Sequence, residues 1–129
     1  MTEPRMPVAL VVTIDVILVA VFCVIGRLSH AEGVLSDIPG LLGTTWPFLV
    51  ALLAAHAVML IRRTSADRML PGVVIWAVTV VVGLVLRALS GQGTAIAFMI
   101  VATLTLALFL IGWRAVAVLV RRVRRGRTA

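Results

Sequence analysis

The sequence of 129 residues has a single cysteine, no lysine and only five acidic residues. One cysteine excludes both a disulfide within the chain and a cysteine-rich metal site. The chain also has no paired carboxylates, no metal-binding cluster of histidine and acidic residues, no phosphate-cradling glycine loop and no serine beside a base. We therefore predict no catalytic residue, no cofactor and no metal site, and a lipid-modifying enzyme is the least favoured class of function.

Long apolar runs dominate what is present. Hydrophobic residues make up 62% of the chain and its mean hydropathy is +1.18, which is too apolar for one soluble core of this size. A helix needs roughly 20 residues to cross a bilayer, and four runs meet this requirement if some tilt is allowed. We predict an all-α polytopic membrane protein, a single integral membrane domain over residues 1–129, with transmembrane helices at about residues 8–26, 43–61, 70–89 and 94–120 and a basic tail at 121–129.

The arginines define the orientation. Ten of the twelve fall on one side of the predicted membrane, namely Arg5, Arg62, Arg63, Arg68, Arg114, Arg121, Arg122, Arg124, Arg125 and Arg127. Arg27 and Arg87 fall on the other side. Because loops rich in positive charge stay in the cytoplasm, we predict a plasma-membrane protein with both termini cytoplasmic and with the loops at 27–45 and 87–93 facing outward.

Five of these arginines lie between Arg121 and Arg127, directly after the last apolar run. Each contributes on the order of 1 kcal/mol of attraction to an acidic leaflet, so we expect this tail to contact anionic lipid headgroups. A nucleic-acid arm is the alternative for a chain of net charge +7, but no interleaved aromatics and no RNA-binding fold accompany the tail. We predict membrane lipid, and a second copy or another membrane protein, as partners, and no nucleic acid.

The second and fourth runs begin with similar motifs, Thr44-x-x-x-Phe48 and Thr94-x-x-x-Phe98, and the first and third end at Arg27 and Arg87. These matches indicate a duplicated helical hairpin, arranged as a parallel repeat about an axis normal to the membrane. Chance similarity between apolar sequences is the alternative.

Small residues indicate where helices approach one another. Thr79 and Gly83 share one face of the third run with Trp76, and small side chains allow close packing of helices in lipid. We expect this face to contact protein. Cys23 is interpreted as a buried hydrophobic residue.

Asp15 is the most costly residue in the predicted membrane. An unpaired aspartate there costs about 2.5 to 3.5 kcal/mol, or stays protonated. Asp15 lies about 12 Å from the inner end of its helix and Arg114 lies about 9 Å from the same side, so we predict an ion pair or hydrogen bond between them. The alternatives are a protonatable Asp15 that faces a cavity as a coupling site, and a simple hydrogen bond to a neighbouring helix.

Four further polar residues complete the candidate set. Arg27, with His30 close by, and Arg87 end their helices at the outer side. Either each side chain extends separately to the headgroups, or the two form a vestibule that attracts an anion or carboxylate. His56 lies deep in the second helix, and we interpret it as a neutral imidazole hydrogen-bonded to a neighbouring helix, with proton transfer as the alternative.

Several of these residues belong to motifs that resemble those of a known family. The motifs are Asp15, Gly26-Arg27-x-Ser29-His30, Thr45-Trp46-Pro47-Phe48, Trp76, Gly83-x-x-x-Arg87, Gly91-x-Gly93-Thr94, Phe98 and Gly112-Trp113-Arg114. The pattern covers nearly the whole chain and is similar to that of the family called domain of unknown function 3054. The resemblance implies a small four-helix membrane protein of a kind found mainly in actinobacteria and their relatives, and it implies no activity. The family pattern has Gly-Trp where this chain has Ala55-His56, so a special role for His56 would not be general.

Two classes of function remain besides an enzyme. The main prediction is a non-catalytic assembly or accessory protein of the membrane. The alternative is a small oligomeric transporter or channel for an ion or a small anionic solute, with Asp15 as a proton or cation site. The candidate functional or structural residues are Asp15, Arg27, His30, His56, Arg87 and Arg114.

Overall fold

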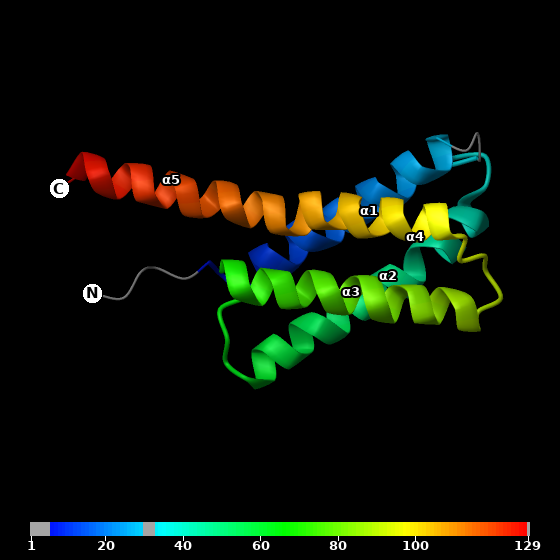
Figure 1. Cartoon of the computed structure of the whole chain (residues 1–129), viewed down its shortest axis with the longest axis horizontal. Helices are drawn as coiled ribbons and strands as arrows, with labels where there is room; N and C mark the ends of the chain where they lie inside the picture. Colours follow the sequence, from blue (N-terminus) through cyan, green and yellow to red (C-terminus); the bar gives the residue numbers. More distant parts are fainter. Residues whose placement is uncertain (1–5, 30–32, 129) are drawn as a thin grey trace.

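The computed structural model describes residues 6–29 and 33–128, and every regular element within them is helical (Figure 1). The elements are α1 (Val8–Ser29), α2 (Ile38–Ile61), α3 (Met69–Leu89), α4 (Ile96–Leu106), the π-helical turn η1 (Ala107–Ile111) and α5 (Gly112–Thr128). The last three follow one another without a break, and together we call them the fourth helix.

Successive helices run in opposite directions along the bundle (Figure 1). The start of α1, the connection from α2 to α3 and the end of α5 lie at one end, on the left of the figure. The start of α2, the end of α3 and the start of α4 lie at the other. The first end carries the arginines of residues 62–68 and 121–127, and we call it the basic end.

All four helices are long and apolar enough to cross a membrane. The distribution of polarity agrees, because large apolar residues cover the outside while Asp15, Thr79 and Arg114 are fully buried. In a bilayer, ionisable side chains turn towards the bundle interior in this way. The chain is therefore a multi-pass membrane protein, and the predicted all-α architecture of four transmembrane helices is confirmed.

Two helix ends differ by five residues or more from their predicted positions. The second helix begins at Ile38 rather than near residue 43, because Asp37 accepts a hydrogen bond from the Gly40 backbone (3.1 Å) and Pro39 stands in the first turn. The fourth helix continues past residue 120 to Thr128. Arginine favours helix as strongly as most apolar residues do, so the change from apolar to basic sequence does not end it.

The face of α3 that was expected to contact protein does so. Thr79 and Gly83 are buried, and a Cβ atom at Gly83 would lie 2.6 Å from the ring of Phe48 on α2. The indole nitrogen of Trp76 donates to the carbonyl of Thr103 on α4 (3.0 Å). Phe48 is itself fully buried, so the missing side chain at Gly83 allows α2 and α3 to pack closely.

Candidate functional site

Asp15, on α1, lies at the centre of a buried polar cluster. Its side chain is 0% exposed, as is that of Arg114 on the fourth helix. Arg114 donates to both carboxylate oxygens, from Nη1 to Oδ1 at 3.0 Å and from Nη2 to Oδ2 at 2.7 Å. The predicted ion pair between these residues is confirmed, and its paired geometry is the strongest that arginine forms with a carboxylate.

Two further side chains complete the shell around this carboxylate. His56 Nε2, on α2, lies 2.7 Å from Asp15 Oδ2, and Trp113 Nε1 donates to Oδ1 at 2.8 Å. Beside an ionised Asp15, His56 Nε2 must carry a proton and donate it. The single hydrogen bond predicted from His56 to a neighbouring helix is thus present. The cluster joins α1, α2 and the fourth helix.

Arg114 makes two further hydrogen bonds inside the protein. Nε donates to the carbonyl of Ala66 in the α2–α3 connection (2.8 Å), and Nη1 also donates to the carbonyl of Leu110 in η1 (2.7 Å). A π-helical turn such as η1 widens the helix by one residue and is frequent at functional sites. Gly72 on α3 makes room for the side chain, because a Cβ atom there would overlap Arg114 Cδ.

A cavity of about 380 Å³ reaches this cluster from the basic end. His56 lines it, together with Met6, with Val11 of α1, and with Arg63 and Ser65 from the α2–α3 connection. The second ring nitrogen of His56, Nδ1, is buried and has no hydrogen-bond partner within the described part of the chain. His56 therefore separates the cavity from Asp15.

Arg27 ends α1 at the opposite end of the bundle and is only 7% exposed. Its guanidinium donates to the carbonyl of Gly33 (2.7 Å), the hydroxyl of Thr44 (3.0 Å) and the carboxylate of Asp37 (3.0 Å). The interpretation that Arg27 extends to lipid headgroups is therefore wrong, because polar groups of the following connection and of α2 hold it within the protein. Asp37 already supplies this arginine with a carboxylate.

Arg87 ends α3 in a similar arrangement. Nε donates to the carbonyl of Gly93 (2.7 Å), Nη1 donates to Gln92 Oε1 (3.0 Å), and the guanidinium lies 4.2 Å from the centre of the Phe98 ring. In both hairpins, Nε of the arginine donates to the carbonyl six residues later. This shared contact agrees with the duplication, which stays a prediction, as does the vestibule between Arg27 and Arg87. His30 lies outside the described residues.

Another ion pair lies at the basic end and joins α5 to the α2–α3 connection. Arg121 on α5 contacts the carboxylate of Asp67 at 2.6 Å, and the Ser65 hydroxyl donates to the same carboxylate at 2.9 Å. Burial by itself raises the pKa of Asp67, but the hydrogen bonds from Arg121 and Ser65 outweigh it, so the pKa lies below its usual value. Asp67 was not among the predicted site residues. Its partner, Arg121, lies just beyond residue 120, where the fourth helix was predicted to end. The sequence therefore did not predict that a helix would place an arginine beside Asp67.

The family of the chain follows from comparison with known proteins. A family model described as "Protein of unknown function (DUF3054)" matches residues 12–117, which is most of the chain. The protein belongs to the DUF3054 family. No curated protein and no solved structure matches it.

The matched part of this DUF3054 protein includes the whole Asp15 cluster, whereas Arg121 and the arginines after it lie beyond the match. Among the described residues, no group of three histidine, cysteine, aspartate or glutamate side chains is placed to hold a metal ion. The sole cysteine, Cys23, is buried within α1, as interpreted from the sequence. The cluster around Asp15 is thus the candidate site that this structure presents most clearly.

Proposed function

We propose that this DUF3054 protein acts without catalysing a reaction, as an assembly or accessory protein of the plasma membrane. The hydrogen bonds that Asp15 already accepts from other side chains of the protein support this proposal. The carboxylate is fully buried and accepts hydrogen bonds from His56, Trp113 and Arg114. A carboxylate that transfers protons or binds a solute has to face water at some stage, whereas this one joins three helices.

The distribution of charge supports an orientation with the basic end, and so both termini, in the cytoplasm. Arg62, Arg63 and Arg68 in the α2–α3 connection and five arginines on α5 lie at that end. At the opposite end, Arg27 is paired with Asp37, which lowers the net charge of that loop further. Arginine-rich loops next to membrane helices stay on the cytoplasmic side.

We propose that the protein contacts its assembly partner through the exposed side of the fourth helix. Of its most apolar 18 residues, 17% are buried, compared with 44% for α2. Its outward side carries Ile100, Leu104 and Leu108, which are all exposed within the single chain. Another transmembrane helix, from a second copy or from a partner protein, can pack along this side.

A photo-crosslinking amino acid tests this contact. Placed at Leu104, which is 65% exposed, it should link the protein to a second copy or to one defined membrane protein in intact cells. The matched control is Leu53, 50% exposed on α2, from which we expect links to lipid. Links to lipid alone from both positions would refute assembly through the fourth helix.

One observation favours the transporter alternative, in which Asp15 is a proton site. The cavity from the basic end reaches His56, whose Nδ1 has no partner within the described residues and whose Nε2 contacts Asp15. Proton flux into liposomes with a pH gradient tests it. If the protein is an assembly factor, flux equals that of empty liposomes. Flux that is lost in both Asp15→Asn and His56→Gln would favour the transporter instead.

A further inference from the structure

The connection between α2 and α3, residues 62–68, turns sharply at the end of α2. The Thr64 backbone donates to the carbonyl of Met59 (2.9 Å) and so closes the last turn of that helix. Within this turn Arg63 has a φ of 52°, in the left-handed region that residues with side chains rarely adopt. Such a conformation persists only where the surrounding structure holds it. The contacts of the following residues therefore decide whether the connection keeps its shape.

The same connection covers the cavity of about 380 Å³ that His56 lines. The lining includes four consecutive residues of the connection, Arg63, Thr64, Ser65 and Ala66. Three of the lining residues on α1 and α2 are nonetheless buried, namely Val11, His56 and Met59. Water therefore has little access to this inner part of the cavity while the connection stays in place.

Two arginines of the fourth helix hold the connection against the bundle. Arg114 Nε donates to the carbonyl of Ala66 at 2.8 Å. Arg121 Nη2 donates to Asp67 Oδ2 at 2.6 Å. The other carboxylate oxygen of Asp67 accepts a hydrogen bond from the Ser65 hydroxyl at 2.9 Å. Asp67 thus links Ser65, which lines the cavity, to the fourth helix.

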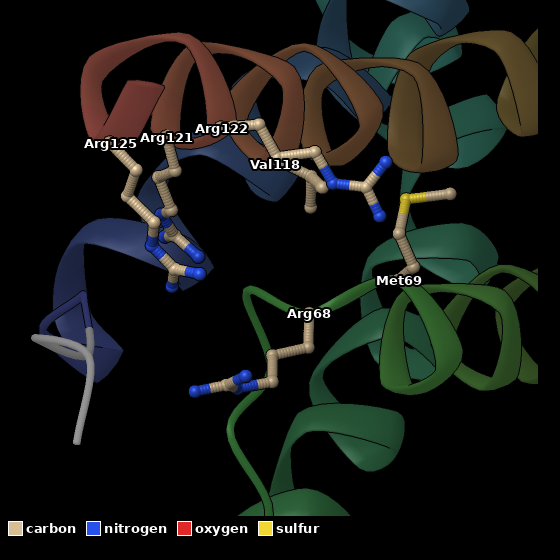
Figure 2. Close-up of a pocket in the computed structure, with 6 residues that line it drawn as sticks. All are labelled: Arg68, Met69, Val118, Arg121, Arg122 and Arg125. Carbon is tan, nitrogen blue, oxygen red and sulfur yellow. The ribbon is translucent and has the colours of Figure 1, made fainter. Parts of the chain in front are cut away.

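The two arginines differ in their surroundings. Arg114 is fully buried and is also bound to Asp15, so its contact with Ala66 is fixed. Arg121 is partly exposed, and Figure 2 shows its side chain running from α5 into the gap between this helix and the connection. Water and salt weaken an ion pair at such a position more than one inside the protein. The contact between Arg121 and Asp67 is therefore the one that can be released.

Release of this ion pair would leave Asp67 in an unfavourable place. Its side chain is 2% exposed, and because a buried carboxylate without its partner is costly, it would turn into water. Ser65 would then lose its link to the fourth helix, and Arg63 could leave its left-handed conformation. The Ala66 carbonyl, still bound to Arg114, would be the point about which these residues turn.

From these contacts we infer that residues 63–65 form a lid on the cavity beside His56, with the Asp67–Arg121 ion pair as its latch and Ala66 as its hinge. With the latch closed, the lid keeps water away from His56 and so from Asp15, which His56 contacts. With the latch open, water from the basic end reaches His56. The lid does not depend on whether the protein assembles with a partner, because it rests on contacts within one chain.

Thiol labelling of the full-length protein in phosphatidylcholine nanodiscs tests the lid. The probe position is Met59→Cys, which is buried in the cavity lining, and the reagent is iodoacetamide, which is uncharged. Asp67→Asn and Arg121→Gln each break the latch, and they change the net charge in opposite directions. Arg122→Gln is the matched control, because it removes the same charge as Arg121→Gln and leaves the ion pair intact. Native Cys23 is buried outside the cavity lining, so its labelling, read separately by peptide mass spectrometry, reports opening elsewhere.

Because labelling requires an open lid, its rate follows the fraction of open molecules. We expect the thiol of Met59→Cys to react about tenfold faster in both latch variants than in the parent and the control, with Cys23 unchanged. Equal rates in the parent and the latch variants would overturn the lid. So would faster labelling in one folded latch variant alone, which would show an effect of charge, or faster labelling of Cys23 as well, which would show separation of the helices. If one latch variant does not fold, the other decides against the control.

Discussion

Asp15 shows how a charged residue becomes acceptable in the middle of a membrane protein. An unpaired carboxylate in the bilayer costs about 2.5 to 3.5 kcal/mol on insertion scales, and removing one partner of a buried pair costs roughly 3 to 5 kcal/mol. Here three side chains from two other helices donate to the carboxylate. Such a pair adds little net stability compared with apolar packing, so its main effect is to select one arrangement of α1, α2 and the fourth helix.

Part of this cluster was predictable from single residues. The similar depths of Asp15 and Arg114 predicted their ion pair. His56 lies five residues before the end of α2 and therefore at a similar depth, so the same reasoning makes it a further candidate partner for Asp15. The contact from Trp113 was not predictable, because it depends on the rotation of the fourth helix about its axis, which the sequence pattern leaves open.

The Asp67–Arg121 pair predicts how stability changes with acidity. Because the pKa of Asp67 is lower in the folded protein than in the unfolded chain, the pair stabilises the fold at neutral pH, and this contribution disappears as the pH falls below about 4. The free energy of unfolding in detergent should therefore be higher for the wild type than for Asp67→Asn at pH 7. The difference should shrink in acid. A difference that does not change with pH would contradict a lowered pKa.

At the scale of elements, the close approach of α3 to the fourth helix depends on Gly72. A side chain at this position would overlap Arg114, which four hydrogen bonds hold in place. Helix ends are set by more local chemistry. The N-cap at Asp37 makes α2 begin before its apolar run, and α5 continues through the arginines after its apolar run. Both predicted boundaries were wrong because an apolar run marks the part of a helix that lies in lipid rather than its full length.

We predict that Gly72→Ala lowers the free energy of unfolding by about 1 to 3 kcal/mol, the usual cost of overpacking, because Arg114 must move away from Asp15. Gly26→Ala is the control. It also lies within a helix, but a Cβ atom there meets nothing within 4 Å, so its effect should be neutral or stabilising. Unfolding titrations in mixed micelles measure both. Equal stabilities of the two variants would show that α3 and the fourth helix do not pack closely at Gly72.

At the scale of the whole molecule, four apolar runs were enough to predict four antiparallel crossings, because each run satisfies the length that a bilayer demands. The packing of these helices against one another was not predictable in the same way, since lipid-facing and protein-facing surfaces are both apolar. Gly72 and Gly83 indicate close packing only once the structure shows that Arg114 and Phe48 lie against them. The orientation in the membrane still rests on the arginines.

Cysteine labelling tests the proposed orientation in intact cells. Single cysteines at Ser36 and Gly93, which are exposed at the end opposite the basic end, should react with an impermeant thiol reagent added outside, and a cysteine at Thr64 should not. Gly93 is preferred to Gly91, whose φ of 81° disfavours any side chain. Cys23 is 1% exposed and contributes little background. Labelling at Thr64 alone would show that the protein has the opposite orientation.

The central claim is that the intramembrane charges fasten the helices, and a double-mutant cycle on Asp15→Asn and Arg114→Gln tests it most directly. Because each single change leaves the other partner buried, the two losses of unfolding free energy should overlap, with a coupling of roughly 1 to 3 kcal/mol. As a control, Asp15→Asn and Arg87→Gln should be additive to within about 0.5 kcal/mol. Additive losses for Asp15→Asn and Arg114→Gln would contradict the claim.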